Sequence, residues 1–275
     1  MTNESVSERL REQTVGLREP VSVSFEFFPP NSDAMDRTLW SSIERLAPLR
    51  PRFVSVTYGA DGSTRERTHA VVSRILNETD LTPAPHLTCV GAPREEILEI
   101  ARQYWDAGIR HIVALRGDMP EGQQHYTPFP GGFDYAVDLV RGLRSIGEFD
   151  ISVAAYPEVH PEARDADSDL DNLKKKLDAG ATRAITQFFF DTDAFLRFRD
   201  RCAAAGIDAE IVPGILPITR VPQMLRFAVR RGPAVPDWMR ERFEALDEDP
   251  DTRRMIAASV AIEQVRRLQQ HGVQE

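Results

Sequence analysis

A single carboxylate, Glu26, lies near the end of an apolar, strand-like run over residues 21–28, which two prolines follow. Three phenylalanines, Phe25, Phe27 and Phe28, are its neighbours in the sequence. Apolar surroundings remove water from a carboxylate and raise its pKa, so that it can hold a proton near neutral pH and act as a general acid. Glu26 could equally pair with a buried arginine and only stabilise the fold, and this segment alone leaves both interpretations open.

Polar side chains also stand at the ends of the other strand-like runs. In a parallel barrel these ends meet on one side of the sheet, where such enzymes carry their active sites. Each residue alone could be a satisfied polar group at the rim, but so many separate clusters together indicate a binding or catalytic site. The set comprises Glu26, Thr57, Tyr58, His86, Thr88, Arg116, Gly117, Asp118, Tyr156, Glu158, His160 and Gln187.

Arg116, Gly117 and Asp118 form the most varied of these clusters. A neighbouring arginine and aspartate are most often a local ion pair, but Gly117 would let a ligand approach the backbone closely. Arg116 could then bind a phosphate or the polar edge of a flat ring, and Asp118 could accept a hydrogen bond from an amino group of that ring. Gln187 could donate to such a ring and accept from it.

The only lysines of the chain, Lys174, Lys175 and Lys176, follow one another on an expected helix. A run of charges is most often a solvated helix face. The helical spacing of Asp169, Asn172 and Lys176 also predicts one shared face, which could hold a diphosphate and the hydroxyls of a sugar. No expected strand contains a lysine, which argues against the Schiff-base chemistry of barrel aldolases.

Short apolar runs alternate with helical patterns along nearly the whole chain, which predicts parallel β-α-β units. Gly108, Gly180 and Gly206 each fit the position after a helix end. Seven units of this kind predict an α/β fold of the (β/α)8 TIM-barrel type, and no Gly-x-Gly-x-x-Gly motif supports a Rossmann fold. The expected strands are 21–28, 53–57, 84–89, 111–115, 151–156, 184–190 and 210–215, and the expected helices are 34–47, 66–78, 93–107, 133–146, 167–179, 192–205, 221–230 and 252–270.

Composition narrows the class of protein. A net charge of −9 and a pI near 5.3 argue against nucleic acid or an anionic membrane as a partner. Two cysteines, a charged N-terminus and no apolar run of membrane-spanning length fit a reduced cytoplasmic protein. No spacing typical of metal ligands occurs, so we expect no bound metal. We expect a polar extension over 1–20 and one catalytic domain over 21–275.

Taken together, these motifs resemble the catalytic barrel of the methylenetetrahydrofolate reductase family. The resemblance covers about residues 20–272 and depends on several segments that occur in the family's order. They are FEFFPP at 25–30, SVTYGA at 55–60, PHLTC at 85–89, ALRGD at 114–118, AYPEVHP at 155–161, TQFFFD at 186–191 and PGILP at 213–217.

The resemblance implies a reaction, its cofactors and the roles of individual residues. Non-covalent FAD would take a hydride from NADH or NADPH, with NADH favoured, and pass it to 5,10-methylenetetrahydrofolate in a ping-pong cycle. Glu26 would be the general acid, Asp118 would contact the pterin and tune the flavin, and Thr57 and Gln187 would meet NADH. Folate would be bound by Asp118, Gln187, Gln223 and Phe227. FAD would be held by Tyr58, Ala60, His86, Arg116, Gly117, Asp118, Tyr135, Ala136, Tyr156, His160, Ala163, Asp169, Asn172, Lys175 and Lys176.

Family members continue beyond the pattern seen here with an eighth strand and a terminal helix. The helix that ends near Gly272 resembles the helices that precede strands elsewhere in the chain. We therefore expect a barrel that lacks its eighth strand, with weakened FAD binding, and we expect a homo-oligomer. Two alternatives remain: a flavin-binding remnant with little or no turnover, and a different flavin barrel such as a proline dehydrogenase-like oxidoreductase.

Overall fold

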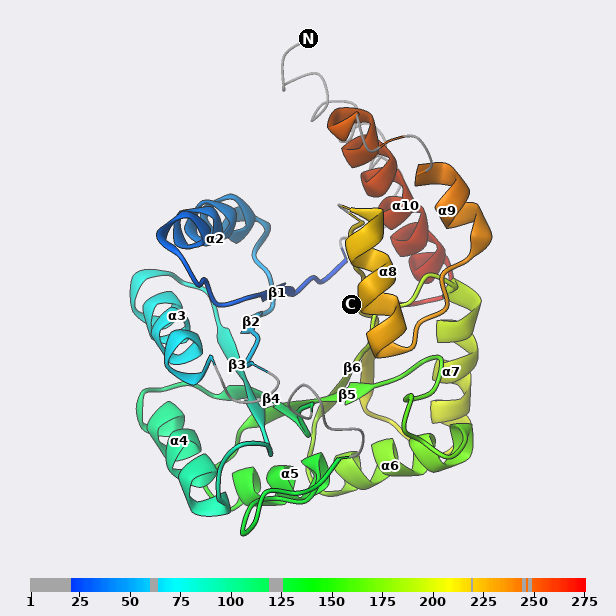
Figure 1. Ribbon diagram of the computed structural model, residues 1–275. Helices are drawn as coiled ribbons and strands as arrows, with labels where there is room; N and C mark the ends of the chain where they lie inside the picture. The colour runs from blue at the N-terminus through cyan, green and yellow to red at the C-terminus, as the bar shows by residue number, and fades with distance from the viewer. Residues whose placement is uncertain (1–20, 60–63, 119–125, 219, 244–245, 247–248) are drawn as a thin grey trace.

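The computed structural model describes residues 21–59, 64–118, 126–218, 220–243, 246 and 249–275. Seven parallel strands form one sheet in the order of the sequence (Figure 1). This half-barrel is the TIM-like α/β fold that the sequence predicts, so the predicted fold class is confirmed. The strands are β1 Phe25–Phe27, β2 Val54–Val56, β3 Pro83–Thr88, β4 His111–Leu115, β5 Asp150–Ala155, β6 Arg183–Thr186 and β7 Glu210–Val212.

Helices follow the strands and cover the outer side of the sheet (Figure 1). Every long helix lies within a few residues of its predicted range. The short helices α9 and η1 were missed because so few residues do not establish a helical period. The helices are α2 Asp33–Leu46, η1 Ala47–Leu49, α3 Arg65–Glu78, α4 Arg94–Asp106, α5 Ala136–Arg144, α6 Ala166–Asp178, α7 Thr192–Ala204, α8 Val221–Arg231, α9 Asp237–Phe243 and α10 Pro250–Gln270. None of the described helices is long and apolar enough to span a membrane.

Local sequence sets the ends of these helices. Gly108, Gly180 and Gly206 have φ angles of 91°, 117° and 71°, the left-handed conformation that ends a helix and that glycine adopts without strain. The predicted role of these three glycines is confirmed. At the start of α6, Asp165 Oδ1 accepts a hydrogen bond from the Ser168 N–H at 2.7 Å, and Ser168 Oγ accepts one from the Asp165 N–H at 3.1 Å. This reciprocal cap fixes where α6 begins.

The two faces of the sheet have different surroundings. The strand register pairs Glu26 with Ser55 and Ser55 with Ala84, so these three residues share the inner face. Phe25 and Phe27 alternate with Glu26 and pack against the main apolar core between sheet and helices. The outer face therefore supplies the core that holds the helices, whereas the inner face carries the polar groups of interest.

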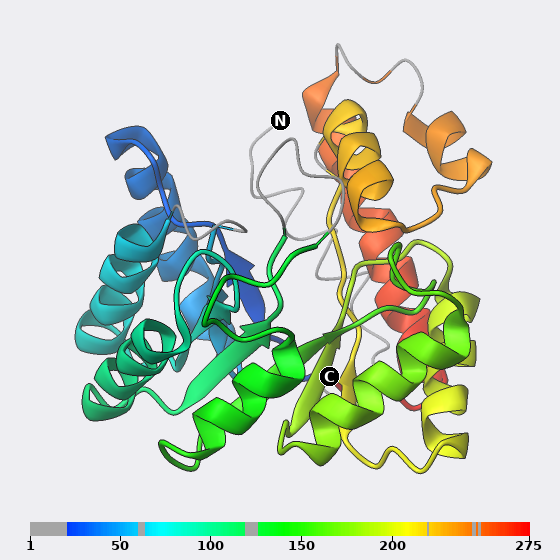
Figure 2. The ribbon, with the colours of Figure 1, turned by 60° about the horizontal axis from the view of Figure 1, so that its bottom comes forward.

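Helices α8, α9 and α10 form a second apolar cluster, which lies largely beyond the carboxyl ends of the strands (Figure 2). Met224 of α8, Met239 and Phe243 of α9, and Val260 of α10 are buried there together with Phe190. This cluster is separate from the main core. Its position brings α8 to the side of the sheet on which the polar strand ends lie.

A buried polar layer fills the inner face at the amino ends of the strands. His111 Nε2 and Ser152 Oγ are 2.8 Å apart. The guanidinium of Arg183 donates to Asp150 at 3.2 Å and to Glu210 at 2.9 Å. The pKa of His111 is lowered to about 4, mainly by burial; the charge of Asp150 raises it and that of Arg183 lowers it. His111 is therefore neutral at physiological pH.

The residues after α10 contact both edges of the sheet, at β1 and at β7. The backbone N–H of Ser22 donates to the carbonyl of Gln274 at 2.9 Å. Glu275 forms an ion pair with Arg52, which also pairs with Glu210 at the start of β7. These contacts lie beside β1 and β7. The sheet of the described residues has seven strands, as predicted, and the predicted weakening of FAD binding stays a prediction.

Candidate active site

The inner face of the sheet brings Glu26 of β1 and His86 of β3 together. Glu26 Oε2 and His86 Nε2 are 3.4 Å apart. The histidine is only 7% exposed, and its Nε2 makes no hydrogen bond with any described residue. Buried polar atoms are nearly always paired. The exposed carboxylate and the buried imidazole nitrogen, which contacts Glu26 but makes no hydrogen bond among the described residues, together favour a ligand site at this point.

The surroundings of Glu26 differ from those that the sequence predicted. Because side chains alternate along a strand, Phe25 and Phe27 pack on the outer face, and Phe28 is 64% exposed. The side chain of Glu26 is 52% exposed, so the predicted enclosure by three phenylalanines is wrong. The open side of the carboxylate instead lets a substrate reach it.

Thr57 and Tyr58 follow β2. The Thr57 N–H donates to the carbonyl of Phe27 at 2.9 Å, which holds the ends of β1 and β2 together. Tyr58 is buried, and its hydroxyl accepts a hydrogen bond from Arg65 Nε at 2.6 Å. Burial raises the pKa of Tyr58, so its hydroxyl stays protonated. Ala60, which the resemblance assigned to FAD, lies outside the described residues.

Arg116 and Gly117 lead out of β4. Both terminal nitrogens of Arg116 donate to Glu162, at 2.6 and 3.0 Å, and the guanidinium lies 4.5 Å from the ring centroid of Tyr126. Gly117 has a φ of 90°, a conformation that brings the backbone close to a ligand without strain. Asp118, the next residue, is half-buried. Arg116 is thus held in place by a carboxylate that the sequence analysis did not single out.

Tyr156 and His160 form a group after β5. Their ring centroids are 4.5 Å apart with the rings nearly perpendicular. The backbone N–H of His160 donates to Asp169 Oδ2 at 2.9 Å, and its carbonyl accepts from the Ala163 N–H at 2.9 Å. Burial lowers the pKa of His160, which favours the neutral imidazole. Asp169 of α6 therefore positions the loop that carries His160.

The lysines of α6 lie in different environments. Lys176 is buried, and its Nζ donates to the carbonyl of Ala154 in β5 at 2.6 Å. Burial lowers the pKa of Lys176 to about 8, whereas Asp169 acts in the opposite direction. Lys175 and Asn172 are exposed. Asn172 and Lys176 therefore differ in exposure although they are four residues apart on α6, and their predicted shared role stays a prediction.

Tyr135 and Ala136 stand at the start of α5. Tyr135 is 51% exposed, and its ring centroid lies 5.7 Å from that of Tyr126. Ala136, the first residue of α5, is buried. Since Tyr126 also lies against Arg116, a continuous aromatic and cationic surface runs from β4 to α5.

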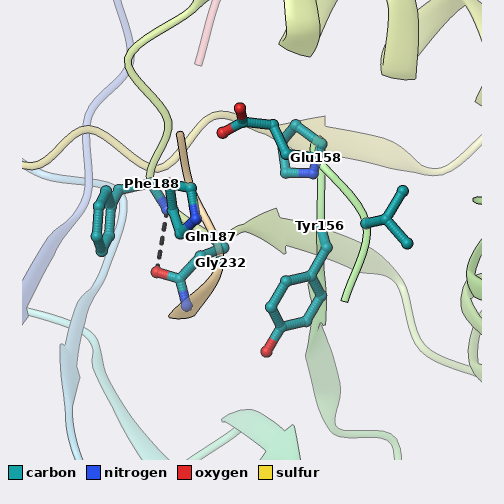
Figure 3. A pocket seen from close by; sticks show the side chains of 8 residues that line it. Tyr156, Glu158, Gln187, Phe188 and Gly232 are labelled. Carbon is teal, nitrogen blue, oxygen red and sulfur yellow. Dashed lines mark hydrogen bonds between the residues drawn. The ribbon is translucent and has the colours of Figure 1, made fainter. Parts of the chain in front are cut away.

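Gln187 follows β6, which ends at Thr186, earlier than predicted. The side-chain Oε1 of Gln187 accepts a hydrogen bond from the Phe188 N–H at 3.1 Å (Figure 3). Gln187 also lines a small cavity of about 10 Å³. The lining residues are Tyr156, Pro157, Glu158, Val159, Gln187, Phe188, Gly232 and Pro233.

The segment directly after α8, the helix that carries Gln223 and Phe227, lines the same cavity. Gln223 is exposed and Phe227 half-buried on α8, and Gly232 and Pro233 follow directly after this helix. The sequence alone gave no reason to select Gln223 or Phe227, and only the resemblance identified them. Their helix lies on the side of the sheet where the polar strand ends gather (Figure 2).

Known proteins resemble this chain along almost its whole length. A sequence model of the methylenetetrahydrofolate reductase family matches residues 11–275. A 5,10-methylenetetrahydrofolate reductase of Pectobacterium carotovorum is 55% identical over 270 residues, which are 98% of this chain and 88% of that protein. The enzyme of the same name from Escherichia coli K12 is 51% identical, over 98% of this chain and 90% of its own length.

The chain belongs to the methylenetetrahydrofolate reductase family. The resemblance inferred from the motifs is confirmed, as is the interpretation of the chain as a reductase of this family. A solved structure agrees in fold, with a TM-score of 0.62 over 96% of this chain and 89% of the other. It is an uncharacterised Clostridium thermocellum protein described as binding two copies of 5-methyl-5,6,7,8-tetrahydrofolic acid, and it is only 15% identical.

Proposed function

We propose that this protein reduces 5,10-methylenetetrahydrofolate to 5-methyltetrahydrofolate with NADH as the hydride donor and FAD as the bound carrier, in a ping-pong cycle. Membership of the methylenetetrahydrofolate reductase family supports the folate reaction. The observation that carries the proposal is the place of Glu26: a half-exposed carboxylate on the inner face, 3.4 Å from a buried histidine. A ring-opening reduction needs an acid that the substrate can reach, and Glu26 lies where a substrate can reach it.

The inner face has unsatisfied polar groups that fit a flat, polar cofactor. Thr88 Oγ1, like His86 Nε2, is buried and has no hydrogen-bond partner among the described residues. Residues two apart on a strand face the same side, so both groups point to the side that carries Glu26. A flavin ring offers both donors and acceptors, and when bound it would accept a hydride from NADH and pass it on.

Cationic and helical groups nearby fit the remaining parts of FAD. Arg116 carries a planar guanidinium that suits a phosphate or the edge of the ring, and it would bind either one in exchange for, or beside, its present partner Glu162. Lys176 is a buried cation whose hydrogen bond among the described residues goes to a carbonyl, so an anion beside it, in addition to Asp169, would stabilise its charged form. We assign Arg116, Lys175 and Lys176, together with His160 and Asn172, to the diphosphate and sugar regions.

Individual residues of the chain would then have separate roles in the reaction. Glu26 would donate a proton to the folate nitrogen as the five-membered ring opens, and Asp118 would accept a hydrogen bond from the pterin. Gln187 and Gln223 would orient the folate, and Phe227 would pack on its flat ring. The Clostridium thermocellum protein of the same fold is described as binding a methylated folate, which supports a folate ligand in this architecture.

A substitution at Glu26 tests the proposal. Glu26→Gln should leave reduction of the flavin by NADH within about twofold of wild type, because that step needs no proton from Glu26. Reduction of the folate should fall by about 10²- to 10⁴-fold, the range of a lost general acid. Rapid-mixing measurement of the two half-reactions separates them, with the exposed Glu148→Gln as the matched control. Equal losses in both half-reactions with the flavin retained would contradict the assigned role.

The same measurements separate the rival functions. A flavin-binding remnant would hold FAD without transferring a hydride to the folate, and a proline dehydrogenase-like enzyme would reduce its flavin with proline. We expect neither result. A preference for NADH over NADPH, a cytoplasmic location and a homo-oligomer stay predictions.

A further inference from the structure

Glu158 connects the loop after β5 to the segment that follows α8. Both carboxylate oxygens lie close to the backbone N–H of Ala234, at 3.2 and 3.3 Å from the nitrogen. We propose that Glu158 is a positioning residue, which anchors the C-terminal end of α8 so that the folate-binding side chains of this helix keep their place over the strand ends. This inference rests on the proposed function.

The conformation of the loop directs Glu158 toward that segment. Val159 has a φ of 72°, a left-handed conformation that a β-branched residue adopts only when its surroundings enforce it. In the close view, Tyr156 and Glu158 point in opposite directions from the end of β5 (Figure 3). Tyr156 packs against His160, and Glu158 reaches Ala234. The loop thus makes contacts in two directions, to His160 through Tyr156 and to Ala234 through Glu158.

A second contact joins the same two segments. Gly232, the residue at which α8 ends, has a φ of 94°, and the position of a Cβ there would lie 3.1 Å from Pro161 Cγ. A larger residue would be strained by its backbone and crowded by Pro161. The glycine therefore permits the close approach that brings the Ala234 N–H within reach of Glu158.

Helix α8 needs an anchor of this kind because it is not part of the main core. Its buried residues, such as Met224, pack in the second cluster with α9 and α10. This helix carries Gln223 and Phe227, whereas Gln187 directly follows strand β6. Glu158 lines the cavity that Gln187 also lines, so its hydrogen bond ties the helix to the sheet-borne part of the folate site.

The charges around Glu158 do not replace this bond. Loss of water raises the pKa of Glu158, the Ala234 N–H lowers it, Asp191 raises it and Arg197 lowers it. Arg197 forms its own ion pair with Asp191 at 3.3 Å. The half-buried carboxylate thus has the Ala234 N–H as a directed partner, and a neutral amide at position 158 could accept the same hydrogen bond.

Two measurements on the FAD-loaded protein test the inference. The variants are Glu158→Ala, which removes the acceptor, Glu158→Gln, which keeps one, and the exposed Glu148→Ala as control. Hydrogen exchange of the backbone over 232–236 reports the anchor without turnover, and steady-state kinetics give KM for 5,10-methylenetetrahydrofolate and kcat. In Glu158→Ala we expect exchange over 232–236 and KM both to rise about tenfold, with kcat, FAD content and melting temperature near wild type. In Glu158→Gln, the exchange rate over 232–236 and KM should both stay within about threefold of the wild-type values.

Each result that would contradict the inference points to a different step of it. Unchanged exchange in Glu158→Ala would overturn the anchor, and faster exchange with unchanged KM would overturn its link to the folate. If Glu158→Ala fails to fold, Ala234→Pro removes the donor N–H instead, and a KM at the wild-type value in that variant would likewise overturn the inference. Absence of folate reduction in the wild-type protein would contradict the proposed function, whereas the exchange experiment tests the anchor independently.

Discussion

Removing the buried charge of Lys176 should stabilise the flavin-free protein and weaken its hold on FAD. The ammonium group is buried and has the carbonyl of Ala154 as a partner at 2.6 Å. Lys176→Met keeps most of the side-chain volume and removes the charge. The variant therefore separates the contribution of the cation to the fold from its contribution to the cofactor site.

The magnitude follows from the pKa of Lys176, which burial lowers from 10.5 to about 8. A base whose pKa is lower in the folded state destabilises the fold at pH values below that pKa, and the protein gains stability as the pH rises from about 8 to 10.5. At pH 7 the shift corresponds to about 3 kcal/mol. The carbonyl of Ala154 loses its donor in the variant, at a cost of about 1 kcal/mol. The net gain is about 2 kcal/mol, or roughly 5 °C in melting temperature for a chain of this size.

The assay is thermal or urea unfolding of the flavin-free proteins at pH 7, followed by titration of each with FAD. The exposed Lys175→Met is the matched control and should leave the stability within about 0.5 kcal/mol of wild type. FAD affinity should fall about tenfold or more in Lys176→Met, because a cation that faces an anionic ligand is lost. A destabilised Lys176→Met variant would refute the argument from burial, and unchanged FAD affinity would refute the assignment of Lys176 to the cofactor.

Two further predictions concern the fold that supports the site. The pKa of His111 is about 4 in the folded state, below the usual 6.5. The free energy of unfolding should therefore fall by up to about 3 kcal/mol between pH 6.5 and 4. His111→Gln should remove this part of the pH dependence in denaturant titrations, and an identical pH profile for both proteins would contradict the prediction. Gly214→Ala would place its Cβ 2.3 Å from the carbonyl oxygen of Thr186 and should lower the free energy of unfolding by more than about 2 kcal/mol. Gly206→Ala, with open space but a φ of 71°, should lower it by about 1 kcal/mol. Similar losses of stability in the two variants would show that movement of the backbone relieves the clash at position 214.

The sequence predicted those features that depend on local patterns. Apolar runs and helix-ending glycines such as Gly108 determine where strands and helices lie, because these patterns extend over only a few residues. The regular alternation of strands and helices then predicted the fold class. The clustering of polar residues at strand ends also followed from that order, since the carboxyl ends of parallel strands meet on one side. Glu26 and His86, far apart in the chain, were predicted at one site for this reason and are 3.4 Å apart.

Features that depend on packing were not predicted. The sequence predicts that the neighbouring phenylalanines surround the Glu26 carboxylate, but strand alternation turns Phe25 and Phe27 to the other face. Helical spacing did not show that Lys176 is buried and Asn172 exposed, because burial depends on what α6 packs against. The ion pair of Arg116 with Glu162 and the bond of Glu158 to Ala234 join residues whose contact no short-range pattern indicates.

The most direct test of the account is anaerobic rapid mixing of the purified, FAD-loaded protein, first with NADH and then with 5,10-methylenetetrahydrofolate. We predict that NADH bleaches the flavin absorbance, that the folate restores it, and that 5-methyltetrahydrofolate forms in equal amount. Bleaching by NADH without reoxidation by the folate, or a protein that binds no flavin, would contradict it.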